Sequence, residues 1–221
     1  FVGGDQRLIP GQPMGVYYGY VCDGIFQSQE EVANHATQAG AAPGRLIYRD
    51  LDGNGVIDDN DRCIIGNPNP DLSLGLNLAL KYKAFTLDMF FAGDFGADIQ
   101  NHMKRQLLSM SYGQLATNRS VDILNAWSPT NTGSDIPALS LTDDNNETRF
   151  SSYYVENGSY MKMKYLKLSY SLPKSLISKL HATNIDVYGQ VENLFTITGY
   201  AGLDPEILPR EYGAIRDTGS Y

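Results

Sequence analysis

The chain has 221 residues, a formal net charge of −8 and a pI near 4.8. A surface that binds nucleic acid needs clustered Lys and Arg, and no such cluster occurs, so nucleic acid is not expected as a partner. No apolar run approaches the roughly 20 residues of a membrane helix, although a membrane-spanning β-strand needs only about 9–11. The N-terminal FVGGDQRLIPGQP lacks the basic and apolar regions of a signal peptide, which predicts either a mature cytosolic protein or a piece of a longer one.

The first third of the chain predicts short elements separated by turns. Ser28 followed three residues later by Glu31 is a capping box, which predicts a helix over 28–39. After the Pro43-Gly44 break, RLIYR and RCIIG are typical of short strands, and the acidic stretch DLDGNGVIDDND lies between them. Region 44–66 is therefore interpreted as an acidic loop with flanking short strands.

Four longer segments alternate apolar and polar residues with a period of two, which is typical of β-strands. The clearest is LSLGLNLALKY, whose five leucines share one face: Leu72, Leu74, Leu76, Leu78 and Leu80. AFTLDMFFAG follows across the short link 81–84, which predicts a hairpin. SYMKMKYLKLSYSLP changes phase between Tyr165 and Leu166, which predicts a β-bulge, and NIDVYGQVENLF is the fourth segment.

A long excursion over 95–158 separates the second of these strands from the third, and its character differs from theirs. We expect helices over 99–110 and 121–127 and a Pro-, Thr-, Asp- and Asn-rich loop over 128–146. The link 81–84 is short by comparison, and short turns on one side with long excursions on the other are the plan of outer-membrane barrels.

A soluble β-sandwich and a transmembrane β-barrel both alternate in this way, and further features favour the barrel. The strands run about ten residues, longer than the usual five or six. Their second faces are polar and suit a water-filled lumen: Asp88, Lys162, Lys164, Lys167, Asp186 and Glu192. Aromatic residues gather near the strand ends: Tyr82, Phe85, Tyr160, Tyr170, Phe195 and Tyr200. The pattern predicts an all-β fold, an antiparallel transmembrane β-barrel segment with long extracellular loops containing short helices.

The acidic loop matches the ligand spacing of a calcium-binding EF-hand loop, with Gly55 at its sharp turn. The predicted ligands are Asp50, Asp52, Asn54, Val56 through its carbonyl, Asp58 and Asp61. The flanking segments are strands, so the helix–loop–helix frame is missing. We expect Ca²⁺ in a structural role, and the alternative is a solvated loop rich in Asx turns.

Other candidate sites are sparse. The three His residues are scattered, and no Ser or Cys lies in a nucleophile motif, so no enzyme activity is expected. Trp127, Tyr17 and Tyr18 are candidate stacking platforms for substrate, with packing within loops or an interfacial girdle as the alternative. Cys22 and Cys63 fit no zinc spacing, and two interpretations stay open: two unrelated buried thiols, or a disulfide in an oxidising compartment. A soluble, calcium-stabilised β-sandwich that binds carbohydrate is the alternative to the barrel.

Several long stretches resemble the C-terminal β-barrel portion of the SusC/RagA family of TonB-dependent outer-membrane transporters. They are GQPMGVYYGYVCDGIFQSQEE, PGRLIYRDLDGNGVIDDNDRCIIGNPNPDLSLGLNLALKYKAFTLDMFFAGDFGADI, NGSYMKMKYLKLSYSLP and VYGQVENLFTITGYAGLDPE. The resemblance extends from about residue 10 to 207. Arg45 stands where the family usually has an acid, and the two cysteines are unusual there, so the resemblance implies no disulfide.

The resemblance implies that residues 1–221 are part of a 22-stranded barrel, without the plug domain and the closing strand. It also implies location in the outer membrane of Bacteroidetes, in contact with outer-membrane lipid, with the long loops extracellular. The implied partners are a SusD-like lipoprotein lid and the TonB complex, which acts through the missing N-terminal region. The implied cargo is a glycan or a peptide, imported with energy from TonB.

Overall fold

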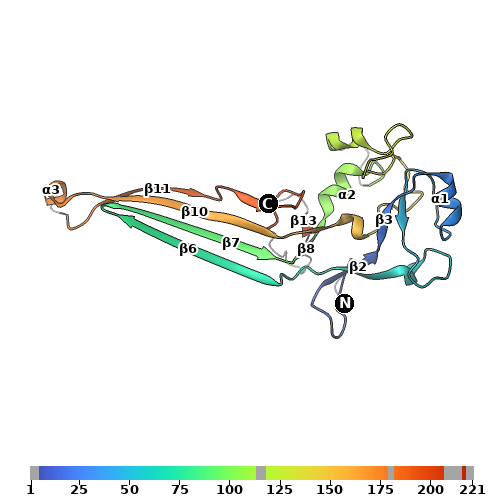
Figure 1. Ribbon diagram of the computed structural model, residues 1–221, viewed down its shortest axis with the longest axis horizontal. Coiled ribbons are helices and arrows are strands. Elements are labelled where there is room, and N and C mark those ends of the chain that lie inside the picture. Colours follow the sequence, from blue (N-terminus) through green and yellow to red (C-terminus); the bar gives the residue numbers. More distant parts are fainter. Residues whose placement is uncertain (1–4, 113–117, 179–181, 207–215, 218–221) are drawn as a thin grey trace. The chain divides into compact units, whose positions relative to one another are not determined.

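A computed structural model describes residues 5–112, 118–178, 182–206 and 216–217 (Figure 1). Its residues divide into two compact units. Unit 1 comprises Phe1–Asn69, Asp98–Asn157 and Ala201–Tyr221, and unit 2 comprises Pro70–Ala97 and Gly158–Tyr200.

Unit 2 is an antiparallel sheet of long strands in the order β11-β10-β7-β6 (Figure 1). The strands are β6 (Leu72–Tyr82), β7 (Phe85–Phe95), β10 (Tyr160–Ser171) and β11 (Asp186–Glu192), and β12 (Thr196–Thr198) also pairs with β10. The predicted hairpin between the first two is confirmed, because Tyr82 lies opposite Phe85 across a two-residue turn. Lys83 occupies the left-handed region in this turn, with φ 53°, as tight hairpins require.

The predicted β-bulge in β10 is confirmed, but it lies one residue earlier than expected. Met163 lies opposite Phe91 and Tyr165 lies opposite Phe90, so Lys164 is the extra residue. The sequence pattern placed Tyr165 with the apolar methionines, whereas the structure places it on the polar face. A tyrosine ring suits either face of such a strand, so its apolar character alone could not fix the position.

Unit 1 contains three small sheets. The first has the order β1-β2-β5, from β1 (Gln6–Arg7), β2 (Val16–Tyr20) and β5 (Arg62–Gly66). The second pairs β3 (Cys22–Ile25) with β4 (Leu46–Tyr48). The third has the order β13-β8-β9, from β13 (Arg216–Asp217), β8 (Asp98–Asn101) and β9 (Val155–Asn157). A cluster of buried hydrophobic residues in unit 1 comprises Tyr20, Ile25, Leu46, Tyr48 and Trp127.

The helices are short. They are α1 (Gln29–Asn34), α2 (His102–Leu108) and α3 (Lys174–Ile177), with 3₁₀ turns η1 (Asp59–Asp61), η2 (Val121–Asn125) and η3 (Ser152–Tyr154). Among the residues that the structure describes, no helix has the length and apolar character needed to cross a membrane.

Two predicted helices are shorter in the structure, because part of each predicted segment forms backbone hydrogen bonds with distant residues instead. The 28–39 helix begins as predicted, with Ser28 accepting from the backbone N–H of Glu31, but it ends at Asn34. Beyond it, Thr37 donates to the carbonyl of Gly55 at 2.8 Å and is held in extended conformation. The 99–110 helix begins only at His102, because residues 98–101 form strand β8. The helix predicted over 121–127 is the 3₁₀ turn η2.

Cys22 and Cys63 are free thiols, so the predicted disulfide is wrong for this structure. Cys22 lies on β3 opposite Tyr48, and Cys63 lies on β5 opposite Gly19, so they belong to different sheets. Burial raises the pKa of the Cys22 thiol to about 11. A thiol with so high a pKa is a poor nucleophile at neutral pH.

Candidate functional site

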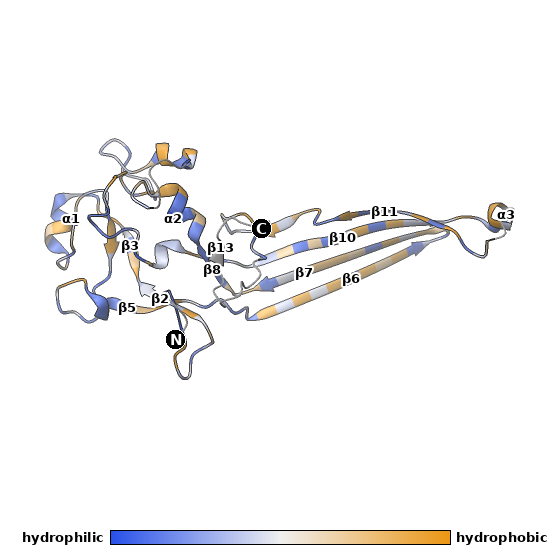
Figure 2. Cartoon of the chain, turned by 180° about the vertical axis from the view of Figure 1, so that it is seen from behind, coloured by the Kyte–Doolittle hydropathy of each residue, from blue (hydrophilic) through white to orange (hydrophobic). Residues whose placement is uncertain are grey.

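The apolar face of the unit 2 sheet is open. The five leucines of β6 expose between 38% (Leu78) and 59% (Leu80) of their surface, and no second sheet covers them in the part of the chain that the structure describes. Figure 2 shows the alternation of hydrophobic and hydrophilic residues along β6, β7 and β10. Exposed apolar area of this extent is unusual on a soluble protein and indicates contact with lipid or with another apolar surface.

The apolar face continues across all four long strands because directly opposed residues share a face. Leu76 lies opposite Phe91, which lies opposite Met163; further along, Leu80 lies opposite Leu87, which lies opposite Leu168. Leu166 and Tyr170 lie opposite Val191 and Val187 on β11. The bulge at Lys164 keeps Met161 and Met163 on the same face as Leu166 and Leu168. Because Lys164 is an extra residue in the strand, the apolar residues before and after it lie on the same face of the sheet.

The second face of the sheet is polar. Asp88 on β7 lies opposite Lys167 on β10, and Lys167 Nζ lies 4.4 Å from the centroid of the Tyr188 ring. Asp94 accepts hydrogen bonds from Ser73 Oγ at 2.6 Å and Tyr160 Oη at 2.9 Å. A sheet with one apolar and one hydrated face is the pattern of a transmembrane barrel wall.

The acidic loop brings three predicted metal ligands together. Asp50, Asp52 and Asp61 each offer a carboxylate oxygen, and these oxygens lie within 4.8 Å of one another. Oxygen atoms that share one Ca²⁺ at about 2.3–2.6 Å lie no more than about 5 Å apart, so this spacing fits a single ion. Asp58, the fourth carboxylate among the predicted ligands, lies outside this group of three.

Asx turns shape the loop. Asp50 accepts from the backbone N–H groups of Gly53 at 2.8 Å and Gly55 at 2.9 Å, and both glycines have positive φ. The N–H of Gly55 is the main reason that the pKa of Asp50 lies below its ordinary value. Asn54 Oδ1 accepts from the N–H of Val56 at 2.7 Å. An amide oxygen has two lone pairs, so this bond does not prevent Asn54 Oδ1 from ligating an ion.

Asp61 anchors the loop to the protein. Its side chain is fully buried and accepts from the N–H groups of Leu51 at 2.7 Å and Asp58 at 2.8 Å. Asp58 caps η1 in return by accepting from Asn60. On the other side, Thr37 binds both Gly55 and Ile57 through backbone hydrogen bonds. The loop is therefore held in shape by protein hydrogen bonds at both of its ends.

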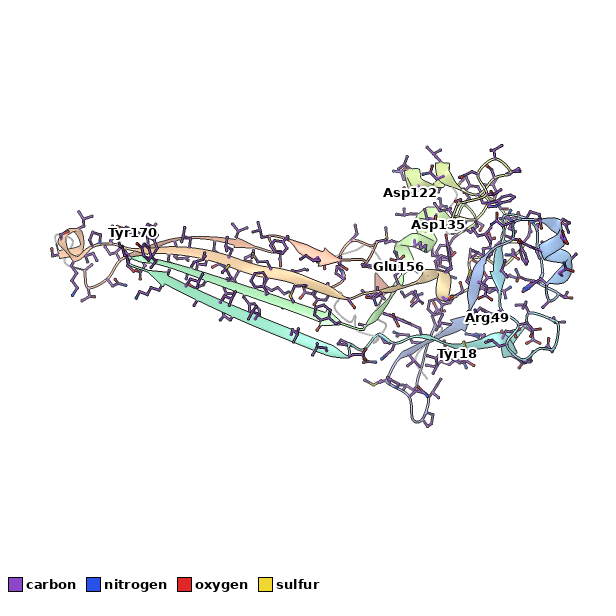
Figure 3. The ribbon with its side chains drawn as sticks, in the orientation of Figure 1. Tyr18, Arg49, Asp122, Asp135, Glu156 and Tyr170 are labelled. Atoms are coloured by element: carbon purple, nitrogen blue, oxygen red, sulfur yellow. The ribbon has the colours of Figure 1, made fainter. Side chains whose placement is uncertain are left out.

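The three predicted stacking residues are largely used in packing within unit 1. Tyr17 is fully buried, and Trp127 is 8% exposed with its indole N–H donating to Gln27 Oε1 at 2.8 Å. Tyr18, labelled in Figure 3, is half-buried, and the guanidinium of Arg7 lies 3.9 Å from its ring centroid. Tyr18 is the most exposed of the three, and substrate stacking at these residues stays a prediction.

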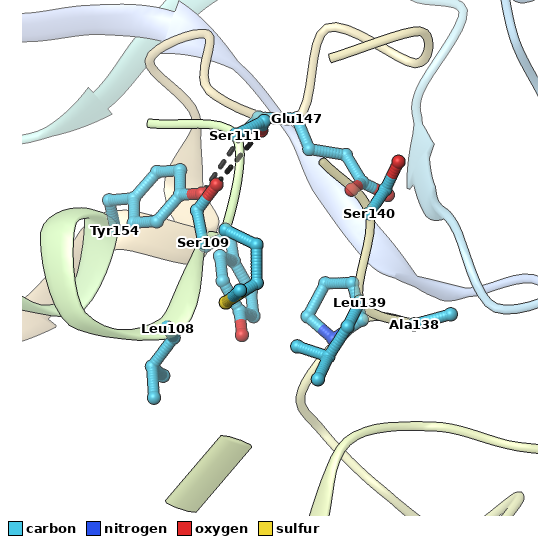
Figure 4. A pocket seen from close by; sticks show the side chains of 11 residues that line it. Leu108, Ser109, Ser111, Ala138, Leu139, Ser140, Glu147 and Tyr154 are labelled. Atoms are coloured by element: carbon cyan, nitrogen blue, oxygen red, sulfur yellow. Dashed lines mark hydrogen bonds between the residues drawn. The ribbon is translucent and has the colours of Figure 1, made fainter. Parts of the chain in front are cut away.

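Unit 1 contains a partly buried polar cluster, Arg45, Asn145 and Glu147, that the sequence pattern does not predict. Asn145 Nδ2 donates to Glu147 Oε1 at 3.4 Å. Arg45 Nη1 lies 3.1 Å from Glu147 Oε2, and the other Glu147 oxygen accepts from the N–H of Leu46 at 3.1 Å. Burial raises the pKa of Glu147 despite these partners. Glu147 also lines a small cavity with Tyr154 and the hydroxyls of Ser109 and Ser111, which lie 3.1 Å apart (Figure 4). In the sequence, the one sign of this group is Arg45, which stands where the SusC/RagA family usually has an acid.

Comparison with known proteins gives relatives of one kind, although no protein-family model matches the chain. The TonB-dependent receptor P3 of Formosa agariphila is 40% identical over 202 residues, which are 91% of this chain and 19% of that protein. SusC of Bacteroides thetaiotaomicron, also a TonB-dependent receptor, is 30% identical over 170 residues, which are 75% of this chain and 16% of that protein. The chain thus spans about a fifth of the length of the curated relatives that it matches first.

Solved structures agree with these relatives. The structure of the RagAB peptide transporter matches with a TM-score of 0.68 and 25% identity, over 93% of this chain and 22% of that chain. The RagAB peptide importer in its open-open state matches with a TM-score of 0.64 and 26% identity. The predicted fold class, part of a transmembrane β-barrel, is confirmed. The chain belongs to the SusC/RagA family of TonB-dependent outer-membrane transporters.

Proposed function

We propose that the chain is part of the barrel wall of an outer-membrane importer that takes up glycans or peptides with energy from TonB. The observation that carries this proposal is the apolar face of β6, β7, β10 and β11, which is continuous from strand to strand and open. Membership of the SusC/RagA family supports it, as do relatives named as receptors and peptide transporters rather than enzymes.

The partners follow from the same family. A SusD-like lipoprotein would cover the extracellular mouth, and the TonB complex would act through a region outside this chain. We place the 81–84 turn at the periplasmic end of the strands and the 95–158 excursion with the acidic loop on the extracellular side. The short two-residue turn supports this orientation, because outer-membrane barrels have short periplasmic turns and longer extracellular loops.

We further propose that the acidic loop binds Ca²⁺ in a structural role. The support is the convergence of Asp50, Asp52 and Asp61 oxygens within 4.8 Å. Three carboxylates this close repel one another, and a bound cation would relieve that repulsion. The ion would stiffen a loop that protein hydrogen bonds already shape, and it would supply no chemistry.

The soluble β-sandwich alternative is not favoured. A sandwich buries the apolar face of each sheet against the other, and the leucine face of β6 has no such cover among the described residues. Solubility of the intact protein tests the two proposals against each other. A barrel requires detergent for extraction from the membrane fraction, whereas a sandwich is released into buffer without it, and release into buffer would refute the importer proposal.

A further inference from the structure

The turn end of the unit 2 sheet concentrates positive charge. Lys81 and Lys83 lie at the β6–β7 turn, and Lys174 begins α3 after β10. All three side chains are exposed, and none forms an ion pair among the described residues. Asp186 is the acid that follows at this end, at the start of β11 opposite Ser171. Among the described residues at this end, three lysines stand against one aspartate, in contrast with the net charge of −8 of the whole chain.

The same end carries exposed aromatic side chains. Tyr82 is 70% exposed and Phe85 is 48% exposed, and the Phe85 ring centroid lies 4.8 Å from that of Tyr170. Figure 3 labels Tyr170 at this end of the sheet. Lys83 Nζ lies 5.3 Å from the centroid of the Tyr82 ring. Aromatic rings with polar edges favour the boundary between hydrocarbon and water, and lysine stems reach along apolar surface while the ammonium stays hydrated.

The lysines and the aromatic residues at the turn end together indicate which chemical group this end binds. The aromatic residues mark the depth at which the apolar face ends, and the lysines lie at that depth or just beyond it. An ammonium group at this level meets the phosphates of lipid headgroups. The attraction is larger for a lipid with net negative charge than for a zwitterionic one, because only the former presents a negative surface potential.

We propose that the turn end of the sheet, defined as Lys81, Lys83 and Lys174 with Tyr82, Phe85 and Tyr170, binds a phospholipid leaflet through anionic headgroups. This inference rests on the proposed function, because the apolar face must lie in a membrane for its end to meet headgroups. It adds the lipid class that the protein selects.

Photocrosslinking in vesicles tests the proposal on the intact protein. A photoreactive benzoylphenylalanine replaces Tyr82, and the vesicles contain phosphatidylethanolamine with a minority of phosphatidylglycerol. We expect phosphatidylglycerol among the lipid adducts at several times its share of the bilayer. The triple variant Lys81→Gln, Lys83→Gln, Lys174→Gln returns this ratio to the bulk value, because it removes the charges that attract the anionic headgroup.

Two control variants test whether the enrichment depends on positive charge at the turn end of the sheet or on any lysine of the sheet. Lys167→Gln removes one lysine of β10 instead. Lys167 shares the polar face with Lys81 but lies further from the turn, opposite Asp88, so the adduct ratio stays at the wild-type value. Replacing the same three lysines by Arg keeps the charge and restores the enrichment. If the glutamine variant fails to insert, wild-type protein in raised salt gives the same information, because screening lowers the enrichment of phosphatidylglycerol.

A second probe distinguishes failure of this inference from failure of the proposed function. With the photoreactive residue in place of Leu76, a barrel wall forms lipid adducts whatever the headgroup. Absence of any lipid adduct at Leu76 refutes the importer proposal and this inference with it. Lipid adducts at Leu76 without enrichment of phosphatidylglycerol at Tyr82, or equal loss in the Lys167→Gln variant, overturn this inference alone.

Discussion

Leu76 of β6 lies directly opposite Phe91 of β7, and both side chains lie on the open apolar face of the sheet. Leu76 is 51% exposed, and the Phe91 ring lies 6.5 Å from that of Phe195, measured between centroids. The next residue, Asn77, lies opposite Phe90 on the other face. Adjacent positions of one strand thus meet different surroundings, which allows the membrane contact to be tested with neighbouring substitutions.

Leu76→Arg should destabilise the folded protein in the membrane by about 2–4 kcal/mol, because it places a guanidinium at mid-depth in hydrocarbon. Asn77→Arg is the matched control, since its side chain reaches the hydrated face and should cost far less. The measurement is the free energy of unfolding of both variants in lipid vesicles, titrated with denaturant. Equal costs for the two substitutions would contradict the assignment of the leucine face to lipid.

Asp50→Ala and Asp52→Ala should each abolish a calcium-binding event in calorimetric titration of the intact protein. Each substitution removes one of the three carboxylates whose oxygens converge within 4.8 Å. Asp122→Ala is the control, because Asp122 lies in η2 outside this group. The wild-type protein and the Asp122 variant should release the same heat. Identical heats for all four proteins would end the calcium proposal.

The sequence predicted the sheet better than the loops, for a physical reason. A strand in a half-exposed sheet alternates strictly, so the leucines of β6 fixed both the strand and its apolar face. Loop conformation depends on distant partners instead. Thr37 lies in a predicted helix but forms a backbone hydrogen bond with Gly55 instead. Ile99 also lies in a predicted helix but pairs with Glu156 in a β-sheet. Such contacts are not encoded in local periodicity.

In the candidate site, too, contacts between residues near one another in the sequence were predictable and contacts between distant residues were not. The spacing of the acidic loop was enough to bring Asp50, Asp52 and Asp61 together, because all three lie within twelve residues. The ion pair between Arg45 and Glu147 joins residues that are 102 positions apart, and no local pattern predicts such a pair. Tyr17 was a candidate platform from composition alone, and its complete burial is a property of the tertiary structure.

Glu147 should make the stability of unit 1 depend on pH. Burial raises its pKa above the ordinary value of 4.5, so the native state binds more protons than the unfolded state between the two pKa values. Stability therefore falls as pH rises from about 4.5 through the raised pKa, and it levels off above that. Glu147→Gln should remove this slope, while Glu30→Gln in the exposed first turn of α1 should leave it. Denaturant midpoints across this pH range provide the measurement, and an unchanged slope in Glu147→Gln would assign it to other groups.

Gly44→Ala should destabilise unit 1 more than Gly11→Ala does. Both glycines have positive φ, 85° and 81°, so each alanine costs about 1–2 kcal/mol for the left-handed conformation. A Cβ at Gly44 would also meet the Trp127 ring and lie 2.7 Å from the Ala138 Cβ, whereas a Cβ at Gly11 meets nothing within 4 Å. The additional cost at Gly44 is that of overpacking, about 1–3 kcal/mol. Thermal or denaturant unfolding of the two variants measures the difference. A difference near zero would show that the Trp127 ring moves aside, contrary to close packing around Gly44.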